Sequence, residues 1–222
     1  MNAVLSKFGP EILEEADSFG WTPLHLAAYL GFVSLIQEFL ETKSYLAYKK
    51  NKEGMSALHL SAMNGNVSAV KKLMEECPDV GEIVDNRNRT ALHIAAETGQ
   101  SFVVKAFFDM RELNNLINEK DREGNTAFHL AALNGHYGII ITMSIDNRVD
   151  KAVINNYGLT AIDTIRSSTK LSSSEKVCTK VQTFPLHNTV IKTLSVEKRN
   201  TNPWFFFFFS HCCVFNWASL IQ

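Results

Sequence analysis

The sequence predicts an all-α solenoid in which short helix-turn-helix units stack on one another, each with a projecting β-turn finger. Two observations predict this fold class. A nine-residue pattern recurs over the first 166 of the 222 residues. Each copy is followed by one apolar helical stripe, which is too narrow to form a core without a neighbouring stripe. A repeat period of roughly 20–50 residues is the signature of such architectures.

The recurring pattern is marked by a histidine, and successive histidines lie 34, 34 and 36 residues apart. A fifth copy begins at Gly158 and has Asp163 at the histidine position. A terminal unit is expected to be atypical, because it has a neighbour on one side only. The four complete copies are Gly20–Ala28, Gly54–Ala62, Asn88–Ala96 and Gly124–Ala132.

Each copy predicts a tight turn followed by a helix. Its first position is glycine in four copies and Asn88 in the other, and these are the residues that best tolerate a positive φ. A serine or threonine follows two places later as an N-cap, and then proline or alanine at the first helical position. Further glycines suit the end of this first helix, at Gly31, Gly65, Gly99 and Gly135.

A second helix is expected after each of these glycines. Its apolar residues recur at helical spacing, as in Val33, Ile36 and Phe39, which predicts one buried stripe in every unit. Small pairs such as Ala27-Ala28 would let the first helices approach closely. No single unit could bury its stripe alone.

The composition changes near residue 166. All eleven glycines fall at or before Gly158, and residues 1–166 carry 16 basic and 21 acidic side chains against 6 and 2 in residues 167–222. We predict that residues 167–203 form a disordered linker rich in serine and threonine. Residues 204–222 form an apolar, phenylalanine-rich tail. The apolar run at 204–221 has a borderline length for crossing a bilayer, so a membrane contact stays open.

Several classes of function are disfavoured by composition and motifs. A formal net charge of −1 gives no field that would attract nucleic acid. Four cysteines without a metal-binding or disulfide pattern favour a reducing, intracellular setting. We find no nucleotide-binding glycine loop and no catalytic constellation, and the regularly spaced histidines lie too far apart to share one metal ion. We therefore expect no enzyme, cofactor, metal or small-molecule substrate.

The segment Thr22-Pro23-Leu24-His25-Leu26-Ala27-Ala28 resembles the ankyrin repeat. The resemblance covers residues 17–166, about five units, and residues 1–16 resemble the end of a preceding repeat's second helix. It implies a curved stack that binds proteins through its concave face. The histidines would then hydrogen-bond across the fingers and between repeats.

The connectors resemble those of plant ankyrin-transmembrane proteins of the accelerated-cell-death type, for example residues 113–121 and 148–151. That family follows its repeats with a membrane domain introduced by Pro-Gly-Gly, a motif that this sequence lacks. The resemblance ends near residue 170. It implies a role in plant signalling or defence, in the cytoplasm or at the plasma membrane.

The partner-binding residues are expected where fingers and first helices vary between copies and point outward. Phe19, Trp21 and Tyr29 are the leading candidates, because aromatic side chains commonly anchor interfaces; the alternative for Trp21 is packing on the neighbouring finger. Arginines and lysines of the fingers would form a mixed basic stripe for an acidic partner, unless they are only solvated. The other candidates are Lys52, Met55, Met63, Arg87, Arg89, Glu97, Arg122, Asn125 and Leu133.

Three functions remain open from the sequence. The first is a non-enzymatic module that binds a protein partner through the concave face. The second is the cytosolic regulatory part of a membrane-anchored signalling or channel-like protein, with residues 204–221 inserted in the membrane. The third is a truncated product of such a gene.

Overall fold

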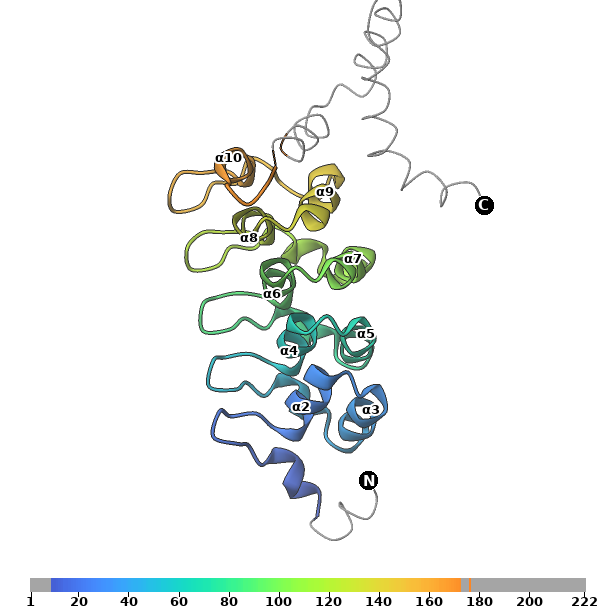
Figure 1. Ribbon diagram of the computed structural model, residues 1–222. Coiled ribbons are helices and arrows are strands. Elements are labelled where there is room, and N and C mark those ends of the chain that lie inside the picture. The colour runs from blue at the N-terminus through green and yellow to red at the C-terminus, as the bar shows by residue number, and fades with distance from the viewer. Residues whose placement is uncertain (1–8, 173–175, 177–222) are drawn as a thin grey trace, which may run out of the picture. The chain divides into compact units, whose positions relative to one another are not determined.

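The computed structural model describes residues 9–172 and residue 176. The chain divides into two units, residues 1–183 and 184–222, and every described residue lies in the first. Helix pairs stack there in two columns, and the fingers project from the first-helix column on the side away from the second helices (Figure 1). The predicted helical repeat fold is confirmed. The predicted linker beyond residue 176 and the tail at 204–222 lie outside the described residues.

The first helices of the five units form one column and the second helices of four units form the other (Figure 1). Within residues 9–172, extended structure is limited to an isolated bridge between Ile154 and Thr160. The first helices are α2 (Pro23–Leu30), α4 (Ala57–Met63), α6 (Ala91–Thr98), α8 (Ala127–Asn134) and α10 (Ala161–Ser167). The second helices are α3 (Val33–Thr42), α5 (Val67–Glu76), α7 (Ser101–Asp109) and α9 (Tyr137–Ile145).

Short 3₁₀ helices connect α3, α5 and α7 to the next finger: η2 (Ser44–Tyr48), η3 (Pro78–Glu82) and η4 (Arg111–Leu116). A further one, η1 (Pro10–Glu14), lies 34 residues before η2 and buries Leu13 in the main core. Residues 10–14 therefore form a connector, and our prediction that they belong to a second helix is wrong. Residues 1–8 lie outside the described part of the chain.

The local signals of the repeat pattern act as predicted. The first finger position has a positive φ throughout, from 61° at Asn88 to 81° at Gly20. Each first helix begins directly after a serine or threonine N-cap, and α2, α6 and α8 end at a glycine in the left-handed region. The tight turn and the helix start are thus fixed by residues whose φ and hydrogen-bonding capacity suit those places.

The main core runs between the two columns. One register of the second helices is completely buried in the four repeats that have one, with Ile36, Val70, Val104 and Ile140 at 0% exposure. Burying such a side chain contributes about 1.5–3 kcal/mol. The first helices pack on one another through small residues such as Ala28 and Ala62, which are also fully buried. Each repeat therefore depends on its neighbours for stability.

Buried histidines tie α2, α4, α6 and α8 to the finger that follows each of them. In α4, the backbone N–H of Ser56 donates to His59 Nδ1 (3.2 Å), so His59 Nε2 carries the proton and donates to the Arg89 carbonyl oxygen (2.9 Å). Neighbouring fingers are also joined directly, as by the bond from the Lys52 N–H to the Phe19 carbonyl oxygen (3.1 Å). The hydrogen-bonding role predicted for the histidines is confirmed by equivalent bonds at His25, His93 and His129.

The fifth unit ends the described stack differently. Asp163 replaces the histidine and caps its own helix: its Oδ2 accepts from the Thr160 hydroxyl (2.7 Å), and its N–H donates to the Thr160 oxygen (3.1 Å). The folded unit extends past our predicted boundary at residue 166, because Leu171 is buried in the main core. The unit is atypical, as expected for a terminal repeat.

Candidate interaction surface

The fingers and the first helices together make one surface, hereafter the finger–helix face. Its variable positions lie at the finger tips and in the last turn of each first helix. All the partner-binding candidates of the sequence lie at these two places. The finger tips are residues 17–21, 51–55, 85–89, 121–125 and 155–159.

An apolar cluster separate from the main core lies at the amino-terminal end of this face. The Trp21 and Tyr29 rings meet edge to face, with centroids 5.4 Å apart and an interplanar angle of 64°. Met63 joins them, and all three are partly exposed. The cluster is completed by the buried residues Met55, Leu60 and Ile94. Trp21 therefore packs within the stack and still presents part of its surface to solvent.

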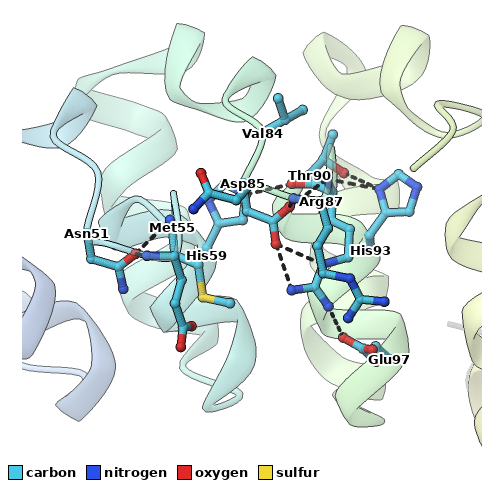
Figure 2. A network of polar contacts seen from close by, with 12 residues as sticks. Asn51, Met55, His59, Val84, Asp85, Arg87, Thr90, His93 and Glu97 are labelled. Atoms are coloured by element: carbon cyan, nitrogen blue, oxygen red, sulfur yellow. Dashed lines mark hydrogen bonds and ion pairs between the residues drawn. The ribbon is translucent and has the colours of Figure 1, made fainter. Parts of the chain in front are cut away.

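A charged network lies at the centre of the face (Figure 2). The Arg89 guanidinium donates to Asp85 Oδ2 through Nε (2.8 Å), forms a 2.7 Å ion pair with the same oxygen through Nη2, and reaches Glu97. Burial acts to raise the pKa of Asp85, but the hydrogen bonds from Arg89 and from the backbone outweigh it and hold that pKa below its ordinary value. Arg89 thus links its finger to the end of α6.

Burial divides the predicted partner-binding residues. Phe19 is 69% exposed and Leu133 45% exposed, and the side chains of Lys52, Arg87 and Arg122 are also exposed. Trp21, Tyr29, Met63 and Glu97 are intermediate.

Three candidates do not point outward as predicted. Met55, Arg89 and Asn125 are 4%, 6% and 5% exposed. Met55 is enclosed in the apolar cluster, Arg89 is held by two carboxylates, and Asn125 accepts a hydrogen bond from Asn155 Nδ2 (2.9 Å). The three residues occupy the same position of their fingers, and in the middle of the stack the neighbouring repeats cover the side chain at this position.

The predicted basic stripe is interrupted by acidic side chains. Arg89 is paired with Asp85 and Glu97, and Arg87 Nη2 lies 3.6 Å from Glu123 Oε1. The face therefore alternates in charge, and an acidic partner has no continuous cationic surface to contact.

The titratable groups of the repeat core are in structural roles. Burial lowers the pKa of His59 to about 4 and lowers those of His25, His93 and His129 as well, so each stays neutral. Burial also raises the pKa of the Cys77 thiol, which keeps it protonated and unreactive. Among residues 9–172, no group of three or more potential ligands could hold a metal ion.

The hollows and helices of the described residues bear on other kinds of site. One hollow, between Leu92, Phe107 and Ile117, has a volume of about 10 Å³, which is room for about one water molecule. A more open hollow of about 300 Å³ lies between Leu30, Gly65 and Asn66, where the first two repeats meet. No helix in the described part of the chain is long and apolar enough to span a membrane.

Comparison with protein families agrees with this geometry. The family model described as "Ankyrin repeats (3 copies)" matches residues 2–83, 44–114 and 62–155, which together cover more than half of the chain. No curated protein matches the sequence. Ankyrin repeats generally mediate protein–protein interactions and are typically non-catalytic. The repeating capped helices, the left-handed finger position and the family match together place this chain in the ankyrin-repeat family.

Proposed function

We propose that this chain is a non-enzymatic interaction module that binds a protein partner through the finger–helix face. The observation that carries the proposal is the apolar cluster of Trp21, Tyr29 and Met63, which presents partly exposed aromatic and sulfur-containing surface on that face. Aromatic residues are common anchors of an interface. Phe19 and Leu133 extend the exposed apolar area along the same face.

The test compares two aromatic surfaces. Peptides selected from a phage-displayed library on the unmodified chain are titrated calorimetrically against Trp21→Ala/Tyr29→Ala and against Phe102→Ala. Phe102 is 81% exposed on α7, in the second-helix column, and serves as the control. We expect the double variant to weaken binding at least tenfold and the control to leave it unchanged, with far-ultraviolet circular dichroism unaltered in both. Equal binding by all three proteins would reject this face.

The setting of that interaction is also part of the proposal. We propose a role in plant signalling or defence, supported by the likeness of the connectors at 113–121 and 148–151 to plant ankyrin-transmembrane proteins. The alternative is a membrane-associated regulatory part, supported by the apolar composition of residues 204–221, which lie outside the described residues. Membrane fractionation of the chain with and without residues 203–222 separates the two. Identical soluble behaviour of both forms rejects the alternative.

A further inference from the structure

The third finger shows how a guanidinium is held on the finger–helix face. Asp85 Oδ1 accepts from the backbone N–H groups of Arg87 (2.8 Å) and Arg89 (2.8 Å), which shapes the turn. Asp85 Oδ2 is left for the guanidinium of Arg89, at 2.8 Å from Nε and 2.7 Å from Nη2. The arginine side chain then continues to Glu97 at the end of the first helix (Figure 2).

The fourth finger has the same carboxylate without the guanidinium. Asp121 Oδ1 accepts from the backbone N–H groups of Glu123 (2.9 Å) and Asn125 (2.7 Å), in the same arrangement as Asp85. Asp121 is only 5% exposed, and among the described residues nothing hydrogen-bonds to its Oδ2. A buried carboxylate oxygen without a donor is an unusual and unfavourable arrangement.

The surroundings of Asp121 differ from those of Asp85 at two positions. Asn125 takes the place of Arg89, and its amide oxygen accepts from Asn155 in the fifth finger. Leu133 takes the place of Glu97 and is 45% exposed. In the fourth repeat the shorter Asn125 amide and the exposed Leu133 therefore stand where the third repeat has Arg89 and Glu97, and Asp121 Oδ2 is buried without a donor among the described residues, so a guanidinium reaches it only when neighbouring side chains move.

We infer that the fourth repeat binds an arginine side chain of the partner, which donates from its guanidinium to Asp121 Oδ2 and lays its aliphatic stem against Leu133. This inference rests on the proposed function of the finger–helix face and names the partner chemistry at one end of it. The third repeat shows that a guanidinium fits this carboxylate geometry. Glu123, two residues further along the same finger, also has an oxygen, Oε2, without a donor among the described residues, while its Oε1 lies 3.6 Å from Arg87 Nη2.

Charge and shape favour arginine over other side chains. Residues 1–166 carry 16 basic and 21 acidic groups, so the repeat stack attracts cations. A planar guanidinium can donate through two nitrogens to one carboxylate, whereas the lysine ammonium acts as a point charge. The partner therefore carries an arginine in addition to the apolar segment that contacts the aromatic cluster.

The first experiment uses the unmodified full-length chain. N-acetyl-arginine-methylamide is titrated while the backbone amide resonances are followed by NMR, with the lysine and citrulline analogues as matched probes. We expect saturable shifts centred on Asp121, Asn125 and Leu133, at least threefold weaker binding of lysine and at least tenfold weaker binding of citrulline. Equal binding of citrulline overturns the role of charge, equal binding of lysine overturns the assignment to arginine, and the absence of shifts overturns the site.

Two variants test the residues. Asp121→Asn keeps the backbone acceptor, since Asn51 and Asn155 accept the same turn bonds in their fingers. We expect it to fold normally and to lose arginine binding at least tenfold. Asn125→Arg fills the site from within, as Arg89 does, so it should also abolish binding and raise the melting temperature by a few degrees. Unchanged binding by either variant contradicts the inference.

The outcome separates this inference from the proposed function. If library peptides bind through Trp21 and Tyr29 but are indifferent to the loss of their arginines and to Asp121→Asn, the inference fails and the interaction surface stands. If neither the peptides nor the arginine probe bind, both fail.

Discussion

The interior of the stack and its finger–helix face are built by the same five units but follow opposite rules. Inside, one register of the second helices holds only fully buried aliphatic residues. On the face, one register holds residues that share neither size nor charge: Trp21, Met55, Arg89, Asn125 and Leu159. Repetition therefore maintains the stacking, while variation at equivalent places gives each repeat a different contact.

The largest expected effect concerns the interior: the free energy of unfolding should fall in mild acid. The repeat histidines have lowered native pKa values, about 4 for His59, whereas the unfolded chain titrates near 6.5. The unfolded state therefore binds more protons between these values, and stability falls as the pH drops from about 6.5 to 4. His59 alone accounts for on the order of 3 kcal/mol, and the other three histidines act in the same direction.

Urea unfolding at pH 7.5, 6.0 and 5.0, followed by circular dichroism, measures this loss. The carboxylates with lowered pKa values, such as Asp85, Asp146 and Asp163, destabilise the fold only below their unfolded value of about 4. The window from pH 6.5 to 4.5 therefore reports the histidines. A urea midpoint that stays constant across it would show that the histidine contacts do not hold the units together.

A second experiment compares two leucines of the same register. Leu60 in α4 is 1% exposed, whereas Leu26 in α2 is 50% exposed. We expect Leu60→Ala to lower the free energy of unfolding by about 2–5 kcal/mol and Leu26→Ala by less than about 1 kcal/mol. Both values come from urea titrations at pH 7.5. Equal losses would mean that the first repeat is covered by something other than the described residues.

A third experiment compares two arginines of one finger. Arg89→Met removes the buried cation between Asp85 and Glu97 and should cost about 2 kcal/mol, less than a fully buried pair, because Glu97 is partly exposed. Arg87→Met removes an exposed cation at 3.6 Å from Glu123 and should change stability by less than about 0.5 kcal/mol. Thermal unfolding at pH 7 provides both values. A stabilised Arg89→Met protein would show that the network serves binding and not folding.

The smallest expected effect concerns the finger turn. Asn88 has a φ of 61° and donates through Nδ2 to the Lys120 carbonyl oxygen (2.9 Å). Asn88→Ala should cost about 1 kcal/mol, because alanine tolerates this φ poorly and loses the bond. Asn88→Gly gains the freer backbone and loses the same bond, so it should stay within about 0.5 kcal/mol of the parent. A larger penalty for glycine than for alanine, in the same thermal assay, would contradict the role of φ.

Local signals made the fold predictable. A register that accepts glycine or Asn88 and little else requires a positive φ, and the structure has one there in every unit. The exposure of the face was less predictable, because register alone does not show what the neighbouring unit covers. For Arg89 a signal existed: Asp85 lies four residues before it and Glu97 eight after it. No comparable sequence signal predicts the burial of Met55 and Asn125, because it depends on residues some thirty positions away.

The hydrogen bonds between successive fingers keep the distance between neighbouring repeats constant. Each finger is linked to the next by one backbone bond of 3.0–3.1 Å near its tip, from Lys52 to Phe19 at one end to Asn156 to Glu123 at the other. Separating two neighbouring fingers would break such a bond, so neighbouring repeats are held about 8–10 Å apart, the usual separation of packed helices. An extended ligand advances about 3.3 Å per residue. Its anchoring side chains would therefore recur about every third residue.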